Sequence, residues 1–397
     1  MNRIITILGV LILLSVLYFA STDKDKVDKK MIGKALLMQI IFALIIVKLP
    51  IGQFIMDKIS AFVTTVINFG YEGLTFVFGG LADSGAPTGM IFAIQTLGVI
   101  VFVSALAAAL NYMGVIGWIV EKLGGVIEKI FGISKAESFV VCANMFLGQT
   151  DAPILVKDVI KNMNNSEILL MLISGMGSIS ATILIGYAGL GIPMKFLLIA
   201  CALVPLSSIM VSKLLMPQTE KVKEQRINMD LRGDSTNILS AITDGALNGM
   251  NMAFAIGASL IAIIGLVAML NGFFGLFGTS LQGILSVVFA PLAFIMGVPF
   301  HSVLDVSSLL GTKMALNEFV AYSQLGGMLS TLDPRTAMMV SVALCGFANV
   351  SSIGICIGGI SILAPSKKDV ISKLAVRGMI GGFLVSVLSA MIVGIVM

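Results

Sequence analysis

The sequence predicts an all-α polytopic membrane protein, with about eight transmembrane helices and two re-entrant hairpins in inverted repeats, together with interfacial helices. Of its 397 residues, 57% are hydrophobic and only 12% are charged, whereas soluble domains carry roughly 25% charged residues. The mean hydropathy of +1.05 comes from apolar runs close to the ~20 residues that a helix needs to cross a bilayer. Polar interruptions at corresponding places in two halves of the chain predict the hairpins. A soluble globular protein is excluded.

Apolar segments of sufficient length predict eight spanning helices. These segments are 4–20, 35–56, 90–111, 168–189, 196–215, 249–271, 336–364 and 374–397. The first segment also has features of a secretory signal peptide, because Arg3 precedes an apolar run. We favour a retained helix, since five lysines follow within 21–34, as is typical of an anchored span whose far end is cytoplasmic.

The distribution of lysine and arginine predicts the side of the membrane on which each loop lies. Three to five basic residues lie in each of 21–34, 112–137, 216–234 and 366–377. Only one lies in each of 57–89, 190–195 and 323–335. The first set is therefore predicted to be cytoplasmic, and both termini are predicted to lie outside. Because the net charge of +4 is spread over short loops, we expect no nucleic-acid partner.

Several segments do not read as simple crossings. Segment 113–131 is amphipathic and segment 281–299 is interrupted by Pro291, so both are predicted to be interfacial helices; 59–82 is predicted to be interfacial or re-entrant. Segments 138–163 and 306–325 are predicted to be re-entrant hairpins, because polar residues interrupt each one near its middle. In lipid, irregular backbone is tolerated only where protein buries it or where it lines a wet cavity, so these tips should line a cavity.

The order of these parts repeats along the chain. Residues 90–215 form one predicted repeat and 249–397 the other, preceded by N-terminal helices in 1–89 and joined by a cytoplasmic connector, 216–248. The sequence 175–180, GMGSIS, is similar to 346–351, GFANVS, and these follow the hairpin tips at Gln149 and Glu318 by 26 and 28 residues. The first repeat begins outside and the second inside, so they are inverted, which is a common plan of secondary transporters.

Polar side chains gather at each hairpin tip and at the break in the span that follows it. They are Asn144, Gln149, Thr150, Asp151, Ser178 and Ser180 in the first repeat, and Asn317, Glu318, Asn349, Ser351 and Ser352 in the second. Ionisable groups at membrane depth usually serve a ligand or a pathway, which makes Asp151 and Glu318 the leading candidates. The alternative role for both is to cap a helix. Amides and hydroxyls without an arginine suit a neutral, hydroxyl-rich solute, and unwound backbone near Ser178 suits Na⁺.

At these residues the chain resembles the concentrative nucleoside transporter family. The resemblance covers roughly 90–397 and is carried by 148–153 (GQTDAP), 317–322 (NEFVAY) and 346–354 (GFANVSSIG). It implies a homotrimer in the bacterial cytoplasmic (inner) membrane, in which each protomer has a scaffold, including most of 1–89, and a mobile transport domain that moves like an elevator. It also implies nucleoside uptake coupled to Na⁺ or H⁺, with no other cofactor.

The resemblance assigns a role to each candidate residue. It places Gln149, Thr150 and Asp151 beside the nucleobase with Ile183 on an apolar side, and Glu318, Asn349 and Ser352 on the ribose with Phe347 beside it. It places the sodium site on Asn144, Leu147, Ser178 and Ile179. Where this chain has Asp151 the family commonly has glutamate, and the shorter side chain favours purine nucleosides.

Other classes of membrane protein remain to be weighed. An embedded enzyme would need a catalytic dyad or a metal-binding carboxylate cluster, and no GxGD, HExxH or DDxxD motif occurs, so we expect no enzymatic activity. A passive channel and a carrier for another polar solute, such as a nucleobase or a sugar, remain open alternatives.

Overall fold

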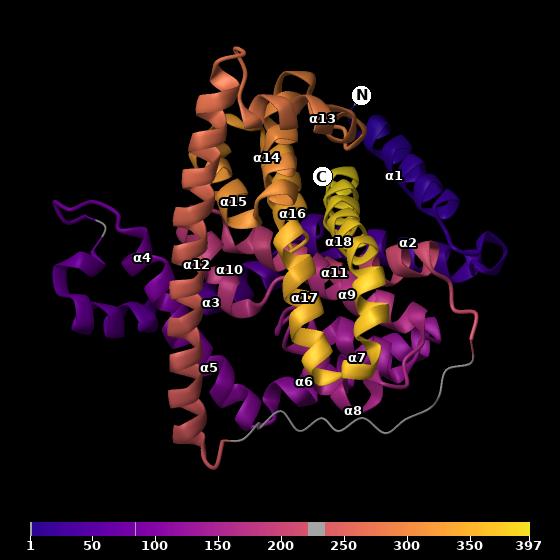
Figure 1. Ribbon diagram of the computed structural model, residues 1–397, viewed down its shortest axis with the longest axis horizontal. Coiled ribbons are helices and arrows are strands. Elements are labelled where there is room, and N and C mark those ends of the chain that lie inside the picture. The colour runs from indigo at the N-terminus through magenta and orange to yellow at the C-terminus, as the bar shows by residue number, and fades with distance from the viewer. Residues whose placement is uncertain (1, 84, 221–234) are drawn as a thin grey trace.

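The computed structural model describes residues 2–83, 85–220 and 235–397, and the regular elements in these ranges are all helices (Figure 1). The N-terminal part consists of α1 (Asn2–Phe19), α2 (Lys29–Ala43), a π-helical turn (Leu44–Lys48) and α3 (Pro50–Phe78). Helix α2 begins where the Asp28 carboxylate accepts hydrogen bonds from the backbone of Lys30 and Met31, both at 3.0 Å, which satisfies donors that a helix start leaves free.

Two predictions for the N-terminal part are wrong. The predicted span 35–56 ends at Lys48, because Leu49 adopts the extended conformation that a following proline favours and Pro50 starts a new helix. Segment 59–82 is not re-entrant, since its larger part continues α3, a single helix of 29 residues. Contacts near both ends tie α3 to the side predicted to be outside. Asp57 pairs with Lys195 at 2.6 Å, and Leu74 packs on Gly98 at the start of α5 (Leu97–Tyr112).

The remaining helices appear in two matching series. The first is α4 (Phe92–Gln95), α5, α6 (Val115–Phe131), α7 (Lys135–Ala143), α8 (Lys157–Ile160), α9 (Asn165–Gly177), α10 (Ala181–Gly189) and α11 (Met194–Leu215). The second is α12 (Ile238–Gly275), α13 (Leu281–Ile295), α14 (Val303–Ala315), α15 (Glu318–Met328), α16 (Pro334–Leu344), α17 (Val350–Leu363) and α18 (Lys368–Val396). In each series a long helix and a shorter helix precede a hairpin, a broken helix and a final long helix, as predicted.

Eight helical stretches of the described ranges are long and apolar enough to cross a membrane, but they are not the eight predicted. They include Pro50–Ala82 and omit 336–364, which is divided into α16 and α17 by the non-helical residues 345–349. The predicted connector 216–248 is also too long, because α12 begins at Ile238, where Asn237 caps it. Residues 221–234 of that connector, with the basic residues predicted to be cytoplasmic, lie outside the described residues.

The two chain termini lie at one end of the molecule (Figure 1). The Arg3 guanidinium donates to the Met397 carbonyl, and Arg335 donates to the carbonyls of Gly394 and Gly297, both at 2.8 Å, and to the Thr6 hydroxyl at 2.7 Å. These bonds join the start of α1, the end of α18 and the loop after α13. Residues predicted to lie outside therefore meet at a common end.

Loops predicted to be cytoplasmic also contact one another. Lys34 Nζ donates to the Ile130 carbonyl at 2.6 Å, which joins the loop before α2 to the end of α6. Thr22 N donates to the Leu215 carbonyl at 3.0 Å, and Lys367 Nζ donates to the Met163 carbonyl at 2.7 Å. The contacts of the basic loops thus agree with one shared side for all of them.

Helix α12 packs along α5, which holds the corresponding place in the first repeat. A Cβ atom at Gly245 would meet Ala108 Cβ at 2.5 Å, and one at Gly249 would meet Val101 Cα at 2.8 Å. The two backbones approach closely because glycines lie four residues apart on α12, the spacing that permits tight helix pairs in membranes. This pair forms one wall of the cavity described below.

Candidate functional site

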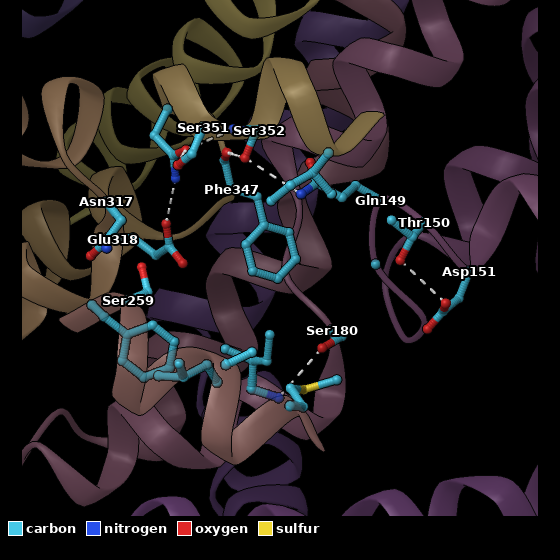
Figure 2. Close-up of a pocket in the computed structure, with 18 of the residues that line it drawn as sticks. Gln149, Thr150, Asp151, Ser180, Ser259, Asn317, Glu318, Phe347, Ser351 and Ser352 are labelled. Atoms are coloured by element: carbon cyan, nitrogen blue, oxygen red, sulfur yellow. Dashed lines mark hydrogen bonds between the residues drawn. The ribbon is translucent and has the colours of Figure 1, made fainter. Parts of the chain in front are cut away.

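A cavity of about 350 Å³ lies between the two hairpin tips, the two helix breaks and α12 (Figure 2). Its lining consists of Leu147, Gly148, Gln149, Thr150, Asp151, Ser180, Ile183, Met252, Ala255, Ile256, Ser259, Leu260, Asn317, Glu318, Phe319, Phe347, Asn349, Ser351, Ser352 and Ile355. All eight residues predicted to bind the solute are among them. The structure therefore brings together residues that are up to about 200 positions apart in the sequence.

The two helix breaks touch each other next to this cavity. Helix α9 ends at Gly177 and α16 ends at Leu344, and both chains run on without helical hydrogen bonding. Phe347 N donates to the Ser178 carbonyl at 3.1 Å, which links the breaks directly. Gly346 has φ +127°, and a Cβ there would lie 2.8 Å from the Gly177 carbonyl, so only glycine fits this crossing.

Local capping explains why the helices resume at the cavity. Asn349 Oδ1 accepts from Ser352 N at 3.0 Å and starts α17, and the Ser180 hydroxyl accepts from Ile183 N at 3.4 Å and starts α10. At the second hairpin tip, Asn317 Oδ1 accepts from Val320 N at 2.9 Å and starts α15. Asparagine and serine therefore satisfy backbone donors that would otherwise be unpaired inside the protein.

Glu318 is held by partners from two other helices. Its side chain is buried, Oε1 accepts from the Tyr187 hydroxyl at 3.0 Å, and Oε2 accepts from Asn349 Nδ2 at 2.9 Å (Figure 2). Tyr187 is fixed in turn by its ring contacts with Phe319 and Tyr322, with centroid separations of 4.7 and 4.4 Å. The capping role considered for Glu318 is wrong, because the residue before it caps α15.

Gln149 connects the first hairpin to the second repeat. Its Nε2 donates to the Ser352 hydroxyl at 3.4 Å, and its Oε1 accepts from Cys356 Sγ at 3.4 Å. The Ser352 hydroxyl also donates to the Phe347 carbonyl. Amide and hydroxyl groups from both repeats thus lie on the same side of the cavity as the Phe347 ring.

Thr150 and Asp151 lie at the edge of the cavity rather than at its centre. Asp151 is exposed, and the Thr150 hydroxyl donates to Asp151 Oδ1 at 3.2 Å (Figure 2). Asp151 precedes a short 3₁₀-helix (Ala152–Val156) but its side chain makes no capping hydrogen bond, so the capping role considered for it is wrong. The two side chains satisfy each other instead of reaching toward Glu318.

The four residues predicted to bind the cation lie where the first hairpin meets the first helix break. Asn144 is fully buried; its Nδ2 donates to the Ser174 hydroxyl at 2.9 Å, whereas its Oδ1 has no hydrogen-bond partner. The Ser178 hydroxyl donates to the Gly175 carbonyl at 3.1 Å, Leu147 lines the cavity, and Ile179 is buried. A buried amide oxygen without a donor is a ligand that suits a hard cation such as Na⁺.

Comparison with known proteins was made on this geometry. Three family models cover most of the chain: Na⁺ dependent nucleoside transporter N-terminus over 8–81, nucleoside recognition over 93–194, and Na⁺ dependent nucleoside transporter C-terminus over 196–394. The chain is 33% identical to nucleoside permease NupC of Helicobacter pylori, over 99% of this chain and 98% of that protein. The chain belongs to the Na⁺-dependent nucleoside transporter family.

Solved structures of this nucleoside transporter family share the whole fold. The transporter CNTnw in an inward-facing, substrate-bound state is 34% identical, with a TM-score of 0.95 over 99% of this chain and 98% of that chain. A variant of CNTnw in an outward-facing state also has a TM-score of 0.95, over 100% of this chain and 98% of that chain. The family consists of transporters rather than enzymes, as the absence of catalytic motifs predicted.

Sequence reasoning missed two parts of the site. One is the wall formed by α12, to which it contributes Met252, Ala255, Ile256, Ser259 and Leu260. This stretch of α12 is apolar apart from one serine, so nothing in its sequence distinguishes it from a lipid-facing helix. The other is Tyr187; its signal was a phenol inside an apolar run, because a buried tyrosine hydroxyl usually has a hydrogen-bond partner.

We predict that Tyr187→Phe lowers the free energy of unfolding by about 1–3 kcal/mol, because it removes a donor from the buried Glu318 carboxyl while keeping the ring contacts. Thermal unfolding in detergent measures this. Tyr112→Phe is the matched control, since the Tyr112 hydroxyl donates to the Thr236 carbonyl at an exposed position. Equal stability losses in the two variants would show that the Tyr187–Glu318 bond has no special role.

Proposed function

We propose that this protein imports nucleosides across the bacterial cytoplasmic membrane by cation symport, through an elevator-type alternating-access mechanism. The observation that carries the proposal is the buried Glu318–Asn349 pair of the second repeat, which faces the same cavity as Gln149 of the first. Inverted repeats whose broken helices meet at a shared site are a plan of secondary transporters. Membership of the family supports the class of solute.

The polar groups of the cavity match the groups of a nucleoside. A carboxyl group and an amide beside it can bond two neighbouring ribose hydroxyls, which is the role we propose for Glu318 and Asn349, with Ser352 next to them. Gln149 and Thr150 offer amide and hydroxyl groups to the nucleobase, and Phe347 and Ile183 offer apolar surface. A volume of about 350 Å³ is within the usual range for small-molecule sites.

We propose Na⁺ as the coupling ion, bound by Asn144, Leu147, Ser178 and Ile179, with H⁺ as the alternative. The unpaired Oδ1 of Asn144 supports this assignment. Because these residues join the first hairpin to the break after α9, a cation there would hold the tip that carries Gln149 in place. Binding of ion and solute would then favour each other, since each stabilises the same arrangement of the tip.

The two walls of the cavity support movement of one body against another. Its polar groups come from the hairpins and helix breaks, whereas α12 contributes a smooth wall of methionine, alanine, isoleucine and leucine with Ser259 alone as a polar residue. We propose that the hairpins and broken helices move as a transport domain along a scaffold that contains α12, α5 and most of 1–89, within a homotrimer. Both termini lie outside in this proposal, consistent with the contacts of the basic loops at the other side.

We predict that Glu318→Gln weakens nucleoside binding at least about tenfold while thermal unfolding changes little, because the amide keeps the shape of the carboxyl group but loses one acceptor. Labelled nucleoside uptake in proteoliposomes measures the first effect and unfolding in detergent the second. Glu121→Gln, at an exposed position of α6, is the control. A loss of stability as large as the loss of binding would assign Glu318 a purely structural role.

We propose that purine nucleosides are favoured, because Asp151 is shorter than glutamate and lies at the edge of the cavity. Unlabelled inosine and guanosine should compete for uptake better than uridine, and Asp151→Glu should reduce this preference. Asp158→Glu makes the same change at an exposed position of α8 and serves as the control. Stronger competition by uridine in the wild type would refute the purine preference without refuting nucleoside transport.

We predict that Asn144→Ala raises the Na⁺ concentration for half-maximal uptake about tenfold or more, since it removes a proposed ligand. Asn111→Ala is a close control, because Asn111 Oδ1 is also buried without a hydrogen-bond partner but lies outside the cavity, on α5. Na⁺ and pH gradients are varied independently. Uptake that follows only the pH gradient in the wild type would assign the coupling to H⁺.

A further inference from the structure

Lys313 is a fully buried lysine in the second hairpin, close to its tip. Its Nζ donates to the carbonyls of Ala343 and Cys345, at 2.8 and 3.4 Å, and to the Ser386 hydroxyl at 2.7 Å. Neither ion pair found among the described residues includes it. Pairing with Asp305, one of two roles open from the sequence, is wrong, because Asp305 is exposed and Lys313 bonds elsewhere.

The environment of Lys313 is that of a bound cation. An ammonium group has three donors and no acceptor, and three oxygens receive them here. Two of these oxygens are carbonyls at the end of α16, where aligned peptide dipoles place partial negative charge. Carbonyl and hydroxyl oxygens are also the ligands that hard metal cations take. Burial of a charge without a carboxylate partner is costly, so these oxygens are its compensation.

The internal repeat relates Lys313 to Asn144. Each lies five residues before its hairpin-tip residue, which is Glu318 for Lys313 and Gln149 for Asn144. The contacts correspond as well. Asn144 Nδ2 bonds the side chain of Ser174, and Lys313 Nζ bonds the carbonyl of Cys345. Ser174 and Cys345 each directly precede the first glycine of their helix break, in GMGSIS and GFANVS.

The two positions differ in what they leave unfilled. In the first repeat the buried Asn144 Oδ1 has no hydrogen-bond partner. In the second repeat the carbonyl oxygens at the break are already occupied by an ammonium group that is covalently part of the chain. The first position therefore offers a ligand to a free cation, and the second position has a cation of its own.

We propose that the Lys313 ammonium fills the second-repeat counterpart of the cation site, so that each nucleoside is accompanied by one exchangeable cation rather than two. This inference rests on the proposed symport. It also makes the two hairpins unequal: the second is attached to α16 at all times, whereas the attachment of the first to α9 depends on the bound ion. Control of the site by ion binding then resides in the hairpin that carries Gln149.

The wild-type protein tests the ion number directly. In proteoliposomes with equal Na⁺ and equal pH on both sides, a tenfold inosine gradient should be balanced by about 59 mV if one charge accompanies each neutral nucleoside. Balance at about half that potential, as expected for two charges, would overturn the inference. A complete lack of nucleoside uptake would refute the proposed function, and the measurement below then decides on Lys313 without any transport.

Variants test the position itself in detergent. We expect Lys313→Asn, which recreates the residue of the first repeat, to add an ion site, so that the slope of the unfolding midpoint against log Na⁺ rises about twofold at saturating Na⁺. Choline chloride keeps the ionic strength constant. Lys313→Met, which adds no oxygen ligand, should lower the midpoint and keep the wild-type slope. A folded Lys313→Asn protein with the wild-type slope would overturn the inference; if that variant does not fold, the wild-type charge ratio decides.

Discussion

The structure depends on the satisfaction of broken backbone inside an apolar body. Two helices are interrupted where they meet, and in a low-dielectric interior every unpaired N–H or carbonyl costs several kcal/mol. The bond from Phe347 N to the Ser178 carbonyl and the close approach of Gly346 to Gly177 join the two interruptions. Caps by Ser180 and Asn349 satisfy further donors where the helices resume. The interruptions are therefore stable only together, and this fixes the two repeats against each other.

The same crossing places the site chemistry. Asn349 has two tasks, because its Oδ1 caps α17 and its Nδ2 bonds Glu318. Gln149 reaches the same helix through the Ser352 hydroxyl, so the tip of the first hairpin is attached to the break of the second repeat. Polar groups that repair the backbone thus also present amide, hydroxyl and carboxyl functions to the cavity. A change that removes a cap at this point would disturb the shape of the site as well as the helix.

The two repeats solve one electrostatic problem in different ways. Exposed carbonyls at the end of α16 are neutralised by the Lys313 ammonium, whereas the corresponding place in the first repeat has the unpaired oxygen of Asn144. Only an amide in this position leaves room for an exchangeable ion. The apolar wall of α12 offers no polar partner that would bind the hairpin tips strongly, apart from the Ser259 hydroxyl. This combination suits a body that must be held together internally and still move along its scaffold.

The sequence alone was sufficient for the helical membrane fold, the two hairpins, the repeat and the eight cavity residues, since polar interruptions in apolar runs have few physical explanations in a membrane protein. It misplaced the boundary at Pro50, because α2 and α3 share one apolar run and only the local backbone separates them. It did not reveal the α12 wall, the Tyr187 bond to Glu318 or the oxygens around Lys313. Those depend on which apolar or buried side chains face each other after packing, and a pattern along one chain contains no such distances.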